Sequence, residues 1–184
     1  LELGPPIGRG ERDGQRVHPR VSALVRNDAD LSDPFRIAVL TGPNNGGKSV
    51  FLQSLGLAQL LAQTGMHVPA AAAELSVADV IATHYPIEER PDKEVGRLHE
   101  EAVRLRDVLA TVTRQSLFLS SETFSSTGAA EAAYLLADVI RALQKLGCRA
   151  VFSTHLHEPA DTVEREPAFE SGENRVANLV APLE

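Results

Sequence analysis

The sequence predicts an α/β fold, in which a largely parallel sheet is flanked by helices, and three observations support this. Short apolar runs alternate along the chain with longer segments of helical periodicity, the pattern of strand–helix–strand crossovers. These runs are too short for buried helices and are bounded by glycine or polar residues. The chain has 184 residues, of which 43% are hydrophobic, enough for one domain with its own core.

Three of the apolar runs predict buried strands, at 36–41, 117–119 and 149–153. Two further segments, 79–83 and 177–180, are candidates for additional strands in the same sheet. Because crossovers through helices join strands that point the same way, we expect these strands to be mostly parallel.

Residues 48–64 predict the first helix, and Gly65 after them is a typical C-terminal cap. Apolar residues recur along this segment at helical spacing. They are Phe51, Leu52, Leu55, Leu60 and Leu61.

Two more helices are predicted further along the chain. One begins at Gly96 and has a single apolar stripe at steps of three and four residues. The stripe consists of Leu98, Ala102, Leu105, Leu109 and Val112. The other, at 128–146, is rich in alanine and leucine and is closed by Gly147.

Composition argues against several functions. The net charge of −7 opposes broad binding to a phosphate backbone, and with 4% aromatic residues and no Trp the chain lacks stacking platforms for single strands. The one cysteine, Cys148, excludes an internal disulfide and fits a reducing compartment, so we expect a cytoplasmic protein. No apolar run approaches the ~20 residues of a membrane helix, so we expect no membrane partner.

A glycine-rich turn between the strand at 36–41 and the first helix fits the full P-loop pattern, Gly42-x-x-x-x-Gly47-Lys48-Ser49. Such a turn directs backbone N–H groups at nucleotide phosphates, and the start of the helix adds the positive end of its dipole. Lys48 would neutralise phosphate charge, and the Ser49 hydroxyl would bind Mg²⁺. ATP and Mg²⁺ are therefore the expected cofactors. The predicted phosphate-binding residues are Gly42, Pro43, Asn44, Asn45, Gly46, Gly47, Lys48, Ser49 and Val50.

Two further residues follow buried strands and are candidates for catalysis. Glu122 comes directly after the strand at 117–119 and is placed to orient or deprotonate an attacking water. His155 follows the strand at 149–153 and could bond the γ-phosphate or that water. We interpret His84 and His157 as ordinary polar side chains.

The ordered set of motifs resembles the MutS family of DNA mismatch repair ATPases. The P-loop from Thr41 to Ser49 is similar to the family's, and Phe152-Ser-Thr-His155 resembles its Ala-Thr-His segment. His18-Pro19 resembles the His-Pro ahead of the nucleotide site, and Val68-Pro69-Ala70 resembles the Val-Pro-Ala after the first helix. The match extends from about His18 to Val180.

The resemblance implies an ABC-type P-loop NTPase fold that works as a homodimer with composite sites. Each site would take its P-loop from one subunit and a helix N-terminus from the other, here the helix that starts at Gly96 and Arg97. The adenine would lie against Leu24 and Val25. We therefore expect one ATPase domain over 1–184, with a small adenine-side segment of loop and short strand at 1–35 and a nucleotide-binding core at 36–184.

The sequence departs from the family pattern at several positions and resembles a divergent MutS-related branch. Val50 replaces the Thr after the P-loop serine, and Gly96 replaces a serine at the helix start. Ser121 replaces the aspartate that supports Mg²⁺, while Glu122 remains. The predicted metal-site residues are therefore Ser49, Ser121 and Glu122, and we expect slow hydrolysis.

Three functions stay open. The leading one is an ATPase domain of a MutS-like protein, in which ATP closes a dimer and moves DNA-facing domains outside this chain. The second is a nucleotide-binding switch with negligible hydrolysis. The third is a P-loop kinase for a small molecule, whose lid could use Arg90, Arg97, Arg104 and Arg106. The first residue is Leu, so we expect the chain to be part of a longer protein.

Overall fold

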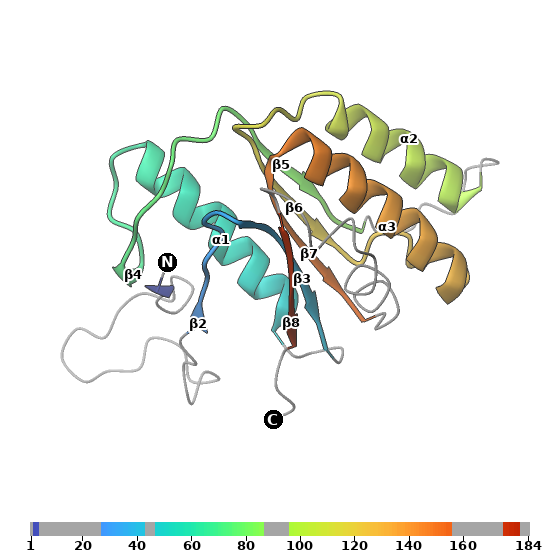
Figure 1. Cartoon of the computed structure of the whole chain (residues 1–184), viewed down its shortest axis with the longest axis horizontal. Helices are drawn as coiled ribbons and strands as arrows, with labels where there is room; N and C mark the ends of the chain where they lie inside the picture. Colours follow the sequence, from blue (N-terminus) through green and yellow to red (C-terminus); the bar gives the residue numbers. More distant parts are fainter. Residues whose placement is uncertain (1, 4–26, 43–46, 87–95, 156–174, 181–184) are drawn as a thin grey trace.

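The structure is a computed structural model that describes residues 2–3, 27–42, 47–86, 96–155 and 175–180 (Figure 1). The strand at 36–41 and the three helices predicted from the sequence are all present. So is the parallel sheet they were expected to form.

The main sheet has five parallel strands in the order β5-β6-β7-β3-β8. Its strands are β5 (Ile81–His84), β6 (Leu117–Ser121), β7 (Arg149–Thr154), β3 (Phe35–Thr41) and β8 (Arg175–Val180). The three central strands are almost entirely buried, which explains why each reads as a continuous apolar run. Both candidate strands from the sequence, in 79–83 and 177–180, join this sheet.

Helices cover both faces of the main sheet, as Figure 1 shows. Helix α1 (Lys48–Gln63) packs Leu52 and Leu55 against one face. Helices α2 (Arg97–Leu109) and α3 (Ala129–Leu146) pack against the other.

Alternation along the strands divides the core between these two faces. Ala38 and Leu40 of β3 belong to the cluster under α1, while Ile37 and Val39 belong to the cluster under α2 and α3. This is the period-two pattern of a strand buried on both sides. The result is a three-layer α/β domain in which a helix, a sheet and two helices are stacked.

A second, smaller antiparallel sheet has the order β2-β1-β4. It consists of β1 (Glu2–Leu3), β2 (Asn27–Asp28) and β4 (Ala70–Ala72). The sequence analysis predicted short strand in the N-terminal segment but not β4, because alanine has low strand propensity. Pairing with β1, which is distant in the sequence, makes this alanine segment a strand.

One detail of the helix predictions is wrong: Val112 is buried but lies beyond the end of α2. Two of the predicted apolar positions, Leu60 and Ala102, lie on the exposed sides of their helices. Each helix packs on the sheet with one side. Within the described residues nothing covers the other side, so apolar residues there stay exposed.

A substitution at Phe118 tests how much the buried core contributes to stability. The Phe118 side chain is fully buried on β6, and its ring centroid lies 5.6 Å from that of Phe152. We expect Phe118→Ala to lower the free energy of unfolding by about 3–5 kcal/mol, measured by urea denaturation, because it removes buried area and leaves a cavity. Val77→Ala, at a side chain that is 79% exposed, should change it by less than about 0.5 kcal/mol. Equal effects of the two substitutions would contradict the packing described here.

Candidate functional site at the carboxyl edge of the sheet

The carboxyl ends of β3, β6 and β7 meet at one edge of the main sheet. Parallel pairing sets Thr41 opposite Thr154, and Ser121 opposite Ser153, on neighbouring strands. The residues that follow these strands include Gly42, Glu122 and His155. In open α/β sheets, ligands bind at this edge.

Helix α1 begins at this edge directly after Gly47, which is left-handed with φ 75°. A side chain is strained in that conformation, so glycine suits the position. The buried side chain of Lys48 turns back over the edge, and its Nζ donates a hydrogen bond to Gly42 O at 2.8 Å. Lys48 thereby links the two ends of the P-loop motif, whose residues 43–46 lie outside the described part of the chain.

Three serine hydroxyls gather beside Lys48. Ser121 Oγ lies 3.2 Å from Ser49 Oγ, and Ser153 Oγ donates a hydrogen bond to Ser121 Oγ at 3.0 Å. Ser121 and Ser153 are buried. The sequence analysis proposed Ser49 and Ser121 as metal-site residues but missed Ser153. Its register opposite Ser121 on the neighbouring strand was the available signal.

Glu122 and His155 form a pair at the same edge. Glu122 Oε2 lies 2.5 Å from His155 Nδ1 and 3.3 Å from the backbone N of His155. Glu122 Oε1 lies 3.8 Å from Lys48 Nζ. The contact uses one ring nitrogen of His155, Nδ1, and leaves Nε2 for another partner. The two residues predicted to be catalytic are therefore in direct contact.

The chain turns sharply after β6, and contacts on three sides hold the turn. Glu122 has φ 51° and donates its backbone N–H to Ser153 O at 2.8 Å. Phe124 has φ 63°, and its side chain is buried in the core. Its backbone N–H donates to Glu101 Oε1 at 2.7 Å.

Glu101 and His84 were not singled out as functional residues in the sequence. His84 is buried at the end of β5, and its Nε2 lies 3.4 Å from Glu101 Oε1. Burial would raise the pKa of Glu101, but the hydrogen bonds from His84, the Phe124 N–H and Ser126 outweigh it, together with the charge of a protonated His84. The pKa of Glu101 therefore lies below its ordinary value. No short motif marks such a pair, because its members come from separate elements.

The other predicted site residues are placed as follows. Val50 lies on α1 and is 48% exposed. Gly96 is the N-cap residue of α2 and Arg97 its first residue, and both are exposed on a helix that packs against β5. The remaining predicted residues fall outside the described part of the chain: Leu24, Val25, Pro43, Asn44, Asn45, Gly46, and the segment with His18 and Pro19.

Three of the four arginines considered for a kinase lid lie on α2. Arg97, Arg104 and Arg106 are spread along α2, and Arg106 is largely exposed and paired with its neighbour Asp107. Arg90 lies outside the described residues. Within the described ranges, no group of three or more His, Cys, Asp or Glu side chains could hold a metal ion. In the same ranges, no helix is both long and apolar enough to cross a membrane.

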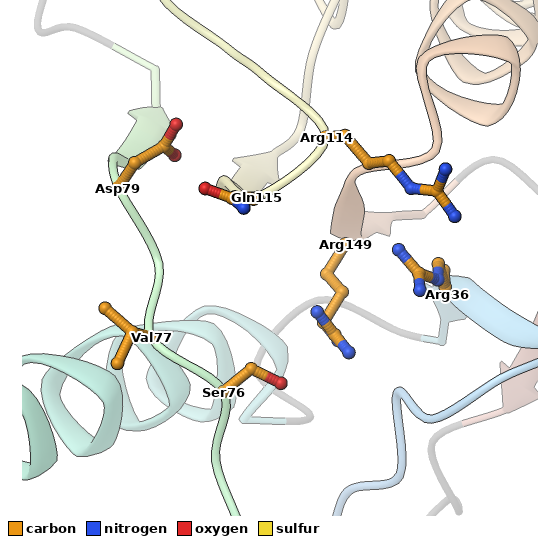
Figure 2. A pocket seen from close by; sticks show the side chains of 7 residues that line it. All are labelled: Arg36, Ser76, Val77, Asp79, Arg114, Gln115 and Arg149. Carbon is orange, nitrogen blue, oxygen red and sulfur yellow. The ribbon is translucent and has the colours of Figure 1, made fainter.

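A cavity of about 400 Å³ lies at the opposite, amino edge of the sheet (Figure 2). It is lined by Arg36, Ser76, Val77, Asp79, Arg114, Gln115 and Arg149. Most of these residues lie at or just before the first residues of β3, β5, β6 and β7.

The charged residues of this cavity hold chain segments together. Arg36 Nη1 donates to Gly147 O at 2.9 Å, and Arg149 Nε donates to Leu31 O at 3.2 Å. Asp79 accepts from the hydroxyls of Thr113 and Ser116, and these hydrogen bonds lower the pKa of Asp79. We interpret the amino edge as a structural anchor, separate from the carboxyl edge.

The fold and the site together define an α/β domain whose polar residues gather at the carboxyl ends of its parallel strands, the edge where open α/β sheets bind ligands. The chain belongs to the MutS family, because the family model of MutS domain V matches residues 38–179. It is a MutS-family ATPase domain, as the resemblance in the sequence indicated.

Individual relatives agree with this assignment. Endonuclease MutS2 of Thermus thermophilus is 35% identical over 152 residues, which are 83% of this chain and 20% of that protein. DNA mismatch repair protein MutS 2 of Halobacterium salinarum is 34% identical over 82% of this chain and 18% of its own length. DNA mismatch repair protein MutS of Prochlorococcus marinus is 35% identical over 73% and 15%, respectively. The chain thus spans at most about a fifth of these relatives.

A substitution at Arg36 tests whether the amino edge affects stability without taking part in nucleotide binding at the carboxyl edge. The mostly buried side chain of Arg36 bonds Gly147 O and both carboxylate oxygens of Asp33. Arg36→Met keeps the aliphatic stem but removes these hydrogen bonds, so we expect the free energy of unfolding to fall by about 1–3 kcal/mol. Nucleotide affinity of the folded variant, measured by fluorescence titration, should stay within about twofold of wild type.

Arg106→Met is the matched control, because the Arg106 guanidinium is largely exposed and pairs with its neighbour Asp107. It should leave stability within about 0.5 kcal/mol of wild type. If Arg36→Met abolished nucleotide binding while the protein stayed folded, the amino edge would be part of the site.

Proposed function

We propose that this chain binds ATP with Mg²⁺ at the carboxyl edge and hydrolyses it, as the motor domain of a MutS-like DNA-processing protein. One observation carries the proposal. A P-loop lysine, a cluster of hydroxyls suited to a hard cation and a carboxylate–imidazole pair meet where three parallel strands end. Hydrolysis of a nucleotide needs each of these, because charge must be neutralised, the phosphate positioned and a water activated.

Lys48 and the N-terminus of α1 would bind the phosphates. Lys48 already lies against the first residue of the P-loop motif, where its charge neutralises β- and γ-phosphate oxygens. The backbone N–H groups at the start of α1 lack intrahelical partners and suit an anion. The residues proposed to line the phosphates extend from Gly42 to Val50.

Ser49 and Ser121 would hold Mg²⁺, and the donor set fits, because Mg²⁺ prefers oxygen ligands and accepts water for the rest. Bound Mg²⁺ would neutralise charge on the phosphates. Ser121 offers a neutral hydroxyl where a carboxylate would attract the ion more strongly. The Glu122 carboxylate contacts His155 and Lys48, so it would act mainly on water.

Glu122 would take the proton from the attacking water, and His155 would orient it. The His155 contact holds Oε2, and Oε1 lies 3.8 Å from Lys48 Nζ, so both carboxylate oxygens are positioned at the edge where the attacking water would lie. His155 Nε2 is left to bond the γ-phosphate or the water.

The proposal extends to the dimer partner, to DNA and to the adenine of the nucleotide. The exposed start of α2, at Gly96 and Arg97, would meet the γ-phosphate held by a second copy in an ATP-dependent dimer. DNA would be held by domains outside this chain, since the chain itself has a net charge of −7. Leu24 and Val25 would contact the adenine, and the single cysteine fits a reducing cytoplasm.

A nucleotide switch with negligible hydrolysis is the second candidate, and the hydroxyl cluster favours it. The Ser121 hydroxyl is hydrogen-bonded to the hydroxyls of Ser49 and Ser153, both neutral. Weak Mg²⁺ binding would slow turnover while leaving the P-loop able to bind ATP. Steady-state ATP turnover, measured with and without DNA, decides between the two functions.

Substitutions at Lys48 and Glu122 test whether ATP binding and ATP hydrolysis depend on different residues. We expect Lys48→Ala to weaken ATP binding by about 100-fold or more, since it removes the main phosphate countercharge. Glu122→Gln should bind ATP within about twofold of wild type and hydrolyse it about 10²–10⁴-fold more slowly, since an amide cannot act as a base. Binding is measured by fluorescence titration and hydrolysis by phosphate release.

Lys145→Ala, in the last turn of α3, is the control for loss of a lysine charge and should bind ATP normally. Normal hydrolysis by Glu122→Gln would show that Glu122 is not the base.

Ser121 tests the metal site. We expect Ser121→Asp to lower the Mg²⁺ concentration for half-maximal turnover and to raise the rate, each by roughly tenfold, because a carboxylate binds the ion and its waters more strongly. Ser76→Asp, at an exposed residue that lines the cavity at the opposite, amino edge, adds the same charge away from the hydroxyl cluster and should change neither value. No gain from Ser121→Asp would remove Ser121 from the metal site.

A further inference from the structure

Glu101 belongs to α2 but binds the turn that follows Glu122. Its Oε1 accepts a hydrogen bond from the Phe124 N–H at 2.7 Å, and its Oε2 accepts one from the Ser126 hydroxyl at 3.3 Å. His84 Nε2 lies 3.4 Å from Oε1. One carboxylate thus joins α2, the end of β5 and the turn after β6.

The turn needs such a restraint because its backbone is unusual. Glu122 and Phe124 both have positive φ, at 51° and 63°, and neither is glycine. L-residues occupy this region only when their surroundings hold them there, and such positions concentrate at functional sites. The Phe124 side chain is buried in the core, which holds one side of the turn, and Glu101 holds its N–H on the other.

Glu101 is well suited to hold a backbone N–H. Its side chain is 13% exposed, and its pKa lies below the ordinary value because the hydrogen bonds it accepts outweigh the effect of burial. It is therefore ionised near neutral pH, and an ionised acceptor makes a stronger hydrogen bond than a neutral one. Its hydrogen-bond partners in the described part of the chain are His84, Phe124 and Ser126, so the nucleotide site itself does not account for it.

We propose that Glu101 is a positioning residue that sets the backbone of the turn at 122–127 and thereby the direction of the Glu122 carboxylate. The inference rests on the proposed function, in which Glu122 is the base. It adds a physical link between that base and α2, the helix whose first residues, Gly96 and Arg97, face the partner's nucleotide in the proposed dimer. One helix then holds both the catalytic turn and the partner-facing end.

The test compares Glu101→Ala and Glu101→Gln with wild type in single-turnover hydrolysis and in nucleotide affinity. We expect Glu101→Ala to slow hydrolysis by about 10- to 100-fold while the nucleotide Kd stays within about twofold. Glu101→Gln should recover most of the loss, because its amide oxygen can still accept from the Phe124 N–H. Asp107→Asn removes an exposed charge further along the same helix and should behave as wild type.

Hydrogen exchange measures the hydrogen bond between Glu101 and the Phe124 N–H independently of ATP hydrolysis. The Phe124 amide should exchange slowly in wild type and much faster in Glu101→Ala, while amides in β7 are unchanged. If wild type hydrolyses no ATP, the proposed function fails, and the exchange result still decides whether Glu101 restrains the turn. If the alanine variant does not fold, Glu101→Met, which preserves side-chain volume, replaces it.

Three results would overturn the inference. The first is hydrolysis by Glu101→Ala at the wild-type rate, and the second is unchanged exchange at Phe124. The third is an equal loss in rate and in nucleotide affinity, which would indicate general damage to the site and not a role in positioning.

Discussion

Parallel pairing of β6, β7 and β3 is the constraint on which the candidate site depends. Because these strands point the same way, everything that follows their last residues lies at one edge. The register then decides which side chains meet. Ser121 is opposite Ser153 on the next strand, and their hydroxyls are 3.0 Å apart. A shift of one residue would turn each of these side chains to the other face of the sheet.

The chemistry at this edge comes from polar groups that the sheet buries and the loops complete. Lys48 and Ser121 are buried, yet each has hydrogen-bond partners, as buried polar groups require. Glu122 is less buried and is held by His155 through its side chain and by Ser153 O through its backbone. Such a site is organised before any ligand enters, which favours electrostatic catalysis.

The two edges of the sheet have different tasks. At the amino edge, Arg36 and Arg149 bind backbone carbonyls and fasten neighbouring segments. At the carboxyl edge, the polar groups face one another around a P-loop lysine. A stable amino edge keeps the strands in register, and this keeps the residues at the carboxyl edge in place.

The sequence by itself determined the strand–helix order, the P-loop pattern and the positions of Glu122 and His155, because these depend on local periodicity and on residues close in the chain. Only the tertiary structure showed that Ser153 joins Ser121, that β4 pairs with β1, and that Glu101 on α2 binds the Phe124 backbone. These are contacts between distant segments, and no local pattern encodes which segments the sheet brings together. Tertiary packing also decided that Leu60 and Ala102 are exposed, because a helix buries only the side that another layer covers.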